Sequence, residues 1–261
     1  MKTVTSISGG QSSAYIAAHY PADFLVFALV CIEDTRCTPK DTKLVQMVSD
    51  RIGRDFIATA EDDTILHTVF DLEQFLGQRI DWVAGKTFER LRKNSLPNIT
   101  WRHCTELMKI QPMFKWWKAT VGKPVKMQIG FRAGEEQRAN RMLQKCDEAG
   151  LRSYRKQAWQ KPVFPMIADN IRKDAVVNFW RGKGVRFAVQ NNCVGCFHRN
   201  PLVLRKMFDM HPKKMQWFAD MEQMKGAQWK SEMTYNQIKK HRLQTEIDFD
   251  EWTCDAGHCG L

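Results

Sequence analysis

Short apolar runs alternate with stretches of helical periodicity in the first part of the chain. Runs of apolar and β-branched residues predict four strands, at Val4–Ser8, Phe24–Ile32, Asp55–Ala58 and Val125–Gly130. Between the first three strands, apolar residues recur at helical spacing in Ser12–His19 and Thr38–Ile52. Alternation of strand and helix is typical of a parallel sheet with helices on both faces, so we expect an α/β fold.

The remainder of the chain follows a different pattern. Residues 62–118 are expected to be mostly helical, with an amphipathic stretch over Cys104–Lys118, and the strand signal fades after Pro165. Helical spacing then returns in Lys173–Arg181, Pro201–Met210 and Pro212–Lys225. We therefore expect an α/β domain over residues 1–170 and a helical region, which carries a CxxC and a cysteine-containing tail, over residues 171–261.

Composition and charge exclude several classes of protein and indicate the kind of partner. The chain of 261 residues is 43% hydrophobic and 26% charged, which is typical of a globular protein and excludes a fibrous or disordered one. The longest apolar run, Phe24–Ile32, is too short to cross a membrane, and Met1–Val4 lacks a signal-peptide core, so we expect a cytoplasmic protein without a membrane partner. The net charge of +11 favours an anionic partner, either a nucleotide or a nucleic acid. A generally basic, soluble surface explains the charge equally well.

The strongest local signal joins the first predicted strand to the first predicted helix and has the sequence Ser8-Gly9-Gly10-Gln11-Ser12-Ser13. Two glycines permit a tight turn with accessible amides, and a helix N-terminus adds N–H groups and the positive end of the helix dipole. Such a loop at the carboxyl end of a strand can bind phosphate, so all six residues are candidate nucleotide ligands. The alternative is an ordinary Gly-Gly turn with a serine cap. The chain has neither a GxxxxGK[ST] nor a GxGxxG motif.

This loop resembles the SGGxxS loop of the PP-loop superfamily, the adenine nucleotide alpha hydrolases. Many ATP-using members have Asp where this chain has Ser12, and the difference favours the branch of phosphoadenosine phosphosulfate (PAPS) reductases. Further segments resemble motifs of that family and come in the family's order, at Arg102–Met113, Ile129–Arg138, Phe164–Ile167 and Lys173–Val176. The resemblance implies a parallel-sheet, Rossmann-like PP-loop domain of the HUP type.

The resemblance also implies an activity. It points to thiol-dependent reduction of a sulfonucleotide, PAPS or APS, to sulfite, with a thioredoxin-like protein as reductant. The alternative within the superfamily is an ATP pyrophosphatase-type enzyme that adenylates a nucleic-acid base for thiolation or a related modification, with an iron–sulfur cluster that carries sulfur. The charge of +11 favours this alternative. A third interpretation is a nucleotide-binding sensor without catalysis.

Two basic residues are candidates for binding the anion. Arg132 follows a predicted strand at the same sheet edge as the glycine loop, where its guanidinium can bind phosphate or sulfate bidentately. We assign it to nucleotide binding and to catalysis. Lys109 lies on the predicted helix with Cys104 and could reach the same anion. For each residue the alternative is a solvated side chain, and Arg138 is a weaker candidate because it pairs equally well with neighbouring glutamates.

Eight cysteines in a chain expected in the cytoplasm favour metal or redox chemistry over disulfides. Cys193 and Cys196 form a CxxC, a spacing that lets two thiolates bind one metal centre. The family resemblance adds Cys104 as a third ligand, because cluster-bearing reductases have Cys-Cys at this place, where this chain has His103 before Cys104. A [4Fe–4S] cluster is the first expectation, structural zinc the second and a free CxxC redox pair the third.

The C-terminal tail contains two more cysteines. The ending Cys259-Gly260-Leu261 partly resembles the tail of sulfonucleotide reductases, whose cysteine attacks the sulfate sulfur to form an enzyme S-sulfonate. The resemblance implies Cys259 as the nucleophile, with Cys254 as the alternative nucleophile. Cys254 is also our expected fourth metal ligand, for which His103, His198 and Cys259 are the other candidates.

Overall fold

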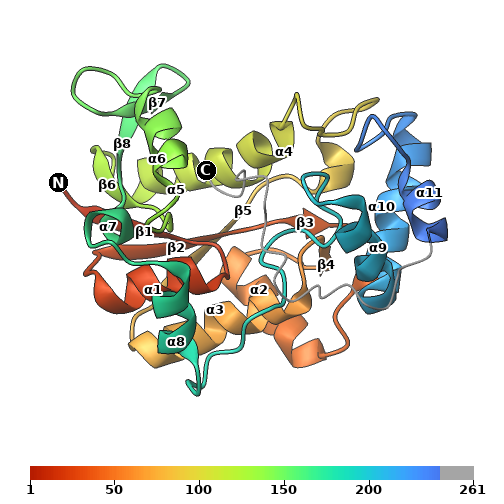
Figure 1. The fold of residues 1–261 in the computed structure, drawn as a ribbon, viewed down its shortest axis with the longest axis horizontal. Coiled ribbons are helices and arrows are strands. Elements are labelled where there is room, and N and C mark those ends of the chain that lie inside the picture. Colours follow the sequence, from red (N-terminus) through yellow and green to blue (C-terminus); the bar gives the residue numbers. More distant parts are fainter. Residues whose placement is uncertain (242–261) are drawn as a thin grey trace.

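The computed structural model describes residues 1–241 and has a six-stranded sheet at its centre (Figure 1). The strands lie in the order β5 (Ile80–Ala84), β2 (Phe24–Leu29), β1 (Thr3–Ile7), β6 (Val125–Gln128), β8 (Gln157–Val163) and β7 (Arg152–Tyr154). All neighbouring pairs are parallel except β7 with β8, which are antiparallel. The expectation of an α/β fold with a mostly parallel sheet is therefore confirmed.

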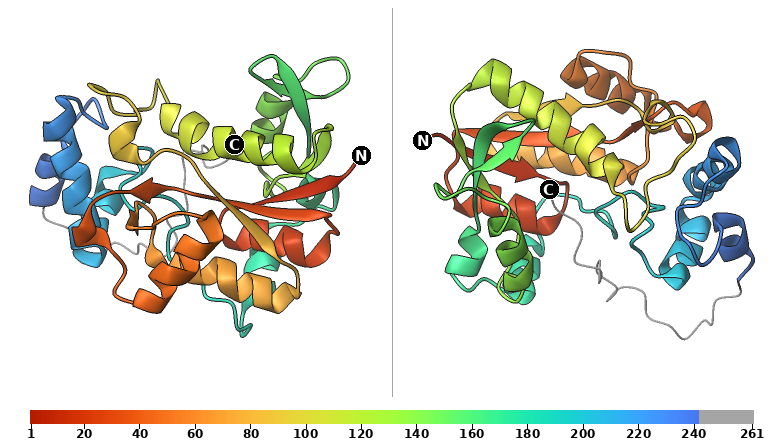
Figure 2. Two further views of the ribbon diagram at one scale, coloured as in Figure 1. Left: turned by 180° about the vertical axis from the view of Figure 1, so that it is seen from behind. Right: turned by 90° about the horizontal axis from the view of Figure 1, so that it is seen from above.

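Helices cover both faces of this sheet (Figure 2). One face carries α1 (Gln11–His19), α2 (Thr42–Ile52), α3 (Asp63–Leu76) and α8 (Lys173–Trp180). The other face carries α5 (Gln111–Thr120) and α6 (Glu136–Leu143). Strand β2 shows why two layers are needed, because nearly all of its residues are apolar and alternate side chains point to opposite faces. Leu25, Phe27 and Leu29 pack towards α1–α3, whereas Val26 and Ala28 pack towards α5.

The prediction of a third parallel strand at Asp55–Ala58 is wrong. Only its end is extended, in β4 (Ala58–Thr59), which pairs antiparallel with β3 (Cys31–Ile32) in a separate ribbon. The third parallel strand is β5, which lies inside the stretch expected to be mostly helical. Its five residues are too few for periodicity to separate a strand from a helix, and pairing with β2 decides the outcome.

The hairpin of β7 and β8 was not expected from the sequence. Strand β8 contains polar residues and Pro162, which has no backbone N–H for a sheet ladder. The hairpin accommodates the proline because β7 pairs with β8 only as far as Gln160, so Pro162 lies beyond this pairing at the outer edge of β8.

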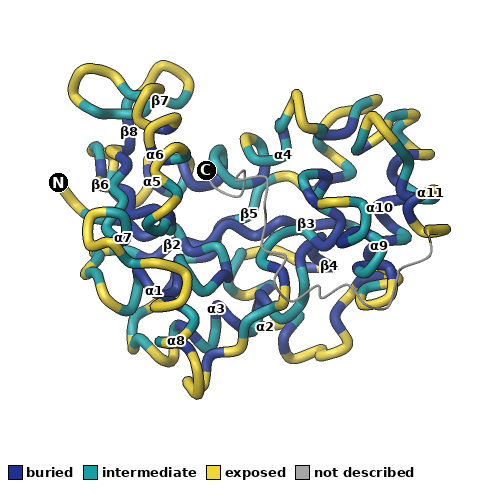
Figure 3. The backbone as a smooth tube through the Cα atoms, in the orientation of Figure 1, coloured by how far each residue is buried: buried dark blue, intermediate teal, exposed yellow. Residues whose placement is uncertain are grey.

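The C-terminal helices build a second apolar core. These are α9 (Pro201–Met210), α10 (Pro212–Lys225) and α11 (Tyr235–Lys240). They pack with the β3–β4 ribbon and with Phe88 and Met108, so residues far apart in sequence share one buried cluster. Figure 3 shows buried backbone in both cores, under the central strands and among these helices. Helix α8 packs on α1 within the first core, and the division of the chain at residue 170 remains a prediction.

Within residues 1–241, no helix combines the length and the apolar character needed to cross a bilayer.

Candidate functional site

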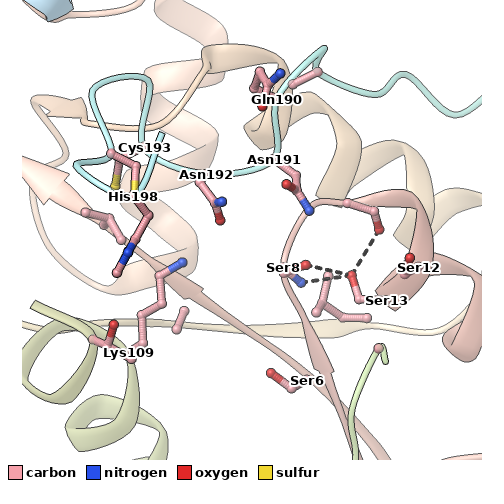
Figure 4. A pocket seen from close by; sticks show the side chains of 18 of the residues that line it. Ser6, Ser8, Ser12, Ser13, Lys109, Gln190, Asn191, Asn192, Cys193 and His198 are labelled. Atoms are coloured by element: carbon pink, nitrogen blue, oxygen red, sulfur yellow. Dashed lines mark hydrogen bonds between the residues drawn. The ribbon is translucent and has the colours of Figure 1, made fainter. Parts of the chain in front are cut away.

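A cavity of about 550 Å³ lies beyond the carboxyl ends of β1 and β6 (Figure 4). After β1 the chain continues to β2 on one side, and β6 is added later on the other side, so β1 and β6 form the point where the strand order reverses. Adjacent loops diverge at such a point and leave a crevice, which is where open α/β sheets bind ligands. The cavity volume is in the range of small-molecule and cofactor sites.

The glycine loop forms one wall of this cavity. Gly9 has φ of +74°, and a Cβ there would lie 2.4 Å from Cγ2 of Ile65, so the turn requires glycine. The backbone N–H of Ser8 donates to Oγ of Ser13 at 3.0 Å, and this hydroxyl donates to the carbonyl of Gly10 at 3.0 Å. Helix α1 starts at Gln11 after a glycine, which has no side chain to cap the first amides. The cavity is lined here by Ser8, Gly10, Gln11, Ser12 and Ser13.

Two arginines form the neighbouring wall. Arg132 donates to Oε2 of Glu135 from its backbone N–H at 2.9 Å and from Nε at 3.2 Å, and Arg138 pairs with the other carboxylate oxygen. Burial alone would raise the pKa of Glu135, but the bond from the Arg132 backbone and the two guanidinium charges outweigh it and lower this pKa. One carboxylate thus orients two guanidinium groups that line the cavity, which leaves this wall positive.

Lys109 supplies a cation on the opposite side. Its Nζ lies 3.1 Å from Oε1 of Glu61, whose side chain is fully buried. Burial alone would lower the pKa of Lys109, but the charge of Glu61 outweighs it and raises this pKa. Figure 4 shows Lys109 and His198 across the cavity from Ser8 and Ser13. The residues expected from the sequence to bind the anion therefore line one cavity, except Gly9, which shapes the turn without lining it.

Three cysteines, Cys104, Cys193 and Cys196, line the same cavity. Burial raises the pKa of the Cys104 thiol to about 11 and that of the Cys193 thiol well above its ordinary value. A thiol with so high a pKa is protonated at neutral pH and is a poor nucleophile. In the metal-free fold, neither Cys104 nor Cys193 is therefore an activated nucleophile.

The CxxC loop is held in place by the core that the C-terminal helices share with the β3–β4 ribbon. Cys193 forms a β-bridge with Glu61, and the N–H of Val194 donates to the carbonyl of Ala60 at 2.9 Å. On its other side, the hydroxyl of Tyr235 donates to the carbonyl of Gly195 at 2.8 Å. Pairing with the β3–β4 ribbon and contacts with the C-terminal helices thus fix the position of the two thiols.

The three thiols are of a chemical type that binds metals, but the described residues do not supply a full set of metal ligands. Thiolate sulfur is a preferred ligand of iron–sulfur clusters and of zinc. Among residues 1–241, however, no group of three or more His, Cys, Asp or Glu side chains is arranged to hold a metal ion. Of the two histidines considered as further ligands, His198 lines the cavity, whereas His103 packs against Trp101 with ring centroids 4.9 Å apart. The expected roles of Cys254 and Cys259 lie outside the described residues.

The structure adds residues that the sequence analysis did not single out. Gln190, Asn191 and Asn192 line the cavity between the glycine loop and the thiols. In the sequence, these three residues form a run of side-chain amides directly before the CxxC, which could have indicated a binding segment. Glu61 has no comparable sequence signal, because it follows a two-residue strand of the separate antiparallel ribbon.

Comparisons of the chain with protein-family models, with curated proteins and with solved structures found no match. The function therefore has to follow from the residues of the cavity.

Proposed function

We propose that the protein is an enzyme of the PAPS reductase type, which binds an adenine nucleotide and reduces a sulfonucleotide to sulfite by thiol chemistry. One observation carries this proposal: a glycine-rich loop at the start of α1 and a group of thiols line opposite sides of one cavity. A phosphate loop alone would suit many nucleotide-binding proteins. Thiols on the facing wall suit a metal centre beside the nucleotide, which the resemblance to cluster-bearing reductases implies.

The cavity supports a definite orientation of the nucleotide. Its phosphates would bind the amides of Gly10–Ser13, where the N-terminus of α1 is positive. The sulfate would lie between Arg132 and Lys109, whose charges stabilise the negative charge that develops on the leaving phosphate. Such placement brings the sulfur atom to the side of the cavity where the cysteines lie.

The proposed reaction has two steps. The thiolate of Cys259 attacks the sulfate sulfur, an S–S bond forms, and the bond between sulfur and the bridging phosphate oxygen breaks with release of the adenosine phosphate. A dithiol of a thioredoxin-like protein then attacks Sγ of Cys259, releases sulfite with the electron pair of the S–S bond and is itself oxidised to a disulfide. The resemblance of the tail assigns this role to Cys259, whereas Cys104, Cys193 and Cys196 are the proposed metal ligands.

No step of this reaction passes through a metal centre. Cys104, Cys193 and Cys196 remain proposed ligands of a [4Fe–4S] cluster or, as second choice, of zinc, with Cys254 as the fourth ligand.

A single-turnover experiment tests this function. The full-length protein, purified without oxygen, is mixed with equimolar PAPS or APS, and mass spectrometry follows the mass increase of a sulfonate on each cysteine peptide. We expect the increase on Cys259 and sulfite release after a dithiol is added. The Cys146→Ser variant serves as control and should react normally, because Cys146 lies outside the cavity lining. If both sulfonucleotides bind but no sulfonate or sulfite forms, the reductase proposal is wrong.

The second candidate is an ATP pyrophosphatase-type enzyme that adenylates a nucleic-acid base. A basic surface next to the cavity favours it, because Arg102 lines the cavity and belongs to a segment rich in arginine and lysine. Release of pyrophosphate from ATP that depends on added RNA or DNA would support this candidate and contradict the first.

A further inference from the structure

The side chain of Asn191 lies directly against the glycine loop. A Cβ on Gly10 would lie 2.4 Å from Nδ2 of Asn191 and 3.1 Å from both Cβ and Cγ of the same side chain. Figure 4 shows the Asn191 amide directed at the loop, on the side of the cavity where Ser8 and Ser13 lie. A side-chain amide from a distant part of the sequence is therefore placed beside the backbone amides of the loop.

The conformation of Gly10 does not require a glycine. Its φ of −103° and ψ of 158° are extended values that any residue adopts. Gly9 differs, because its φ of +74° lies in the left-handed region. The three atoms nearest to a Cβ on Gly10 all belong to the side chain of Asn191. The second glycine of the loop therefore leaves room for Asn191.

The segment that carries Asn191 is held on both sides. Before it, the carbonyl of Arg186 accepts a hydrogen bond from Oγ1 of Thr68 at 2.6 Å. Next to it, the side-chain oxygen of Gln190 accepts a hydrogen bond from the guanidinium of Arg199, and both of these residues are buried. The amide of Asn191 thus reaches the loop from an anchored backbone, so little ordering is needed before it binds a ligand.

The amide of Asn191 has unused hydrogen-bonding capacity. A side-chain amide carries two N–H donors, and this one makes no hydrogen bond to any of residues 1–241. Asn191 is half-buried and lines the cavity, where a few placed polar groups orient a ligand. An N–H donor beside a loop of N–H donors suits a ligand that accepts several hydrogen bonds, as phosphate and sulfate do.

We propose that the side-chain amide of Asn191 is a further ligand of the phosphate that binds the glycine loop. The amide donates to a non-bridging oxygen of this phosphate, and Gly10 is a glycine so that the amide can come this close. The inference rests on the proposed binding of an adenine nucleotide. It does not rest on the reduction of a sulfonucleotide, because a phosphate of PAPS, APS or ATP would meet the same amide. Asn191 is a binding residue and takes no part in bond breaking.

Calorimetry of the full-length protein with ADP and with adenosine tests the proposal. Asn191→Ala should weaken ADP binding by about 10- to 100-fold, the effect of losing one hydrogen bond to a charged group. Adenosine binding and the melting temperature should be unchanged, because adenosine has no phosphate. Asn191→Asp has the same shape but replaces the amide with a carboxylate, so it should weaken ADP binding further. This additional loss should shrink in high salt, which screens repulsion between charges.

A double-mutant cycle tests the contact with Gly10. Gly10→Ala should weaken ADP binding in the wild-type background, because its Cβ displaces the Asn191 amide. In the Asn191→Ala background the same change should cost about threefold less affinity or better, as expected for coupled residues in contact. Only Cβ of residue 191, at 3.1 Å, then remains of the three nearest atoms. Equal losses in both backgrounds would contradict the proposal.

Asn140→Asp is the matched control, because Asn140 is exposed on α6 and lies outside the cavity lining. It should change ADP affinity by less than about twofold. The proposal is overturned if Asn191→Ala binds ADP as tightly as the wild type, or if it weakens adenosine binding to the same extent. Tighter ADP binding would also overturn it, since Asn191 would then occupy the phosphate position. A wild-type protein that binds ADP but forms no sulfite from PAPS or APS contradicts only the reductase function.

Discussion

The two facing walls of the cavity are built in opposite ways. The wall formed by the glycine loop is local, because Ser8, Gly10 and Ser13 bond to one another within six consecutive residues. The opposite wall, which we call the thiol wall, is assembled from Glu61, Lys109 and the CxxC loop, which are far apart in sequence and meet where their segments share one apolar core. A local motif can be recognised from sequence, and a single bulky substitution within it should abolish its binding. A wall assembled from distant segments depends on contacts between buried side chains, so removing one partner should destabilise the folded protein.

The largest expected effect comes from removing the buried partner in the thiol wall. Glu61→Ala leaves the ammonium of Lys109 without its carboxylate, 3.1 Å away in the native protein. Breaking a buried ion pair costs about 3–5 kcal/mol; because the Lys109 side chain is 27% exposed, the free energy of unfolding in urea should fall by about 3 kcal/mol, the lower end of this range. Adding Lys109→Met to Glu61→Ala should restore much of the loss, because no unpaired charge then remains.

A surface pair provides the control for this measurement. Arg186 pairs with Asp71 at 2.7 Å, and the Arg186 side chain is 58% exposed. Arg186→Gln should cost less than about 1 kcal/mol. If Glu61→Ala costs no more than Arg186→Gln, the thiol wall does not depend on the Glu61–Lys109 pair.

A bulky side chain in the glycine loop should abolish nucleotide binding by steric clash. A Cβ on Gly10 would lie 2.4 Å from Nδ2 and 3.1 Å from Cβ of Asn191, so Gly10→Val displaces the Asn191 side chain and fills the cavity beside the loop. We expect affinity for adenine nucleotides to fall by about 100-fold or more in calorimetry, because the amides no longer converge on a phosphate. Gly184→Val is the control, since a Cβ at Gly184 meets no atom within 4 Å among the described residues. Unchanged affinity in Gly10→Val would exclude the loop as the phosphate site.

The reactivity of the Cys104 thiol should differ between the folded protein and the unfolded chain. The pKa of Cys104 is raised by burial to about 11 from an ordinary value near 9, so the folded, metal-free protein binds more protons than the unfolded chain between these pH values. The contribution of this thiol to stability is complete below about pH 9 and is lost as the pH rises towards 11. At pH 7.5, alkylation of Cys104 by iodoacetamide should be about 100-fold slower than in urea, as followed by peptide mass spectrometry. Equal rates in both states would show that Cys104 is not shielded by the fold.

The positive wall beside the phosphate loop should show a smaller effect. Arg132→Ala removes one guanidinium, but Arg138 stays paired with Glu135 at the same wall. We therefore expect a loss of about 1.5 kcal/mol in nucleotide affinity, near the lower end for a charge-assisted hydrogen bond. The loss should be larger for ligands with a terminal phosphate or sulfate than for adenosine. A loss that is the same for all of these ligands would make Arg132 a structural residue.

The smallest expected effect on stability concerns the metal centre. Cys193→Ser/Cys196→Ser should abolish iron and zinc in the anaerobically purified protein, while Cys146→Ser should retain them, as measured by elemental analysis. The melting temperature should fall only by a few degrees, because the apolar core of the C-terminal helices already joins them to the β3–β4 ribbon. Full metal content in the double variant would exclude the CxxC as the ligand pair.

The local features of this protein follow from the sequence alone. The apolar strand β2, the glycine loop and the helix α1 were all predicted, because strand burial, a Gly-Gly turn and a helix start each depend on neighbouring residues. The position of Arg132 just after β6 was predicted for the same reason. The α/β class then follows from the order of these elements.

Tertiary structure alone decided which distant residues meet. Segment Asp55–Ala58 and strand β5 have similar short apolar patterns, and only pairing with β2 selects β5 for the parallel sheet. The contact of Glu61 with Lys109 depends on the β3–β4 ribbon packing against the helical segment that follows Cys104. Short patterns are ambiguous because their energies as strand or helix are close, and long-range pairing and burial supply the difference.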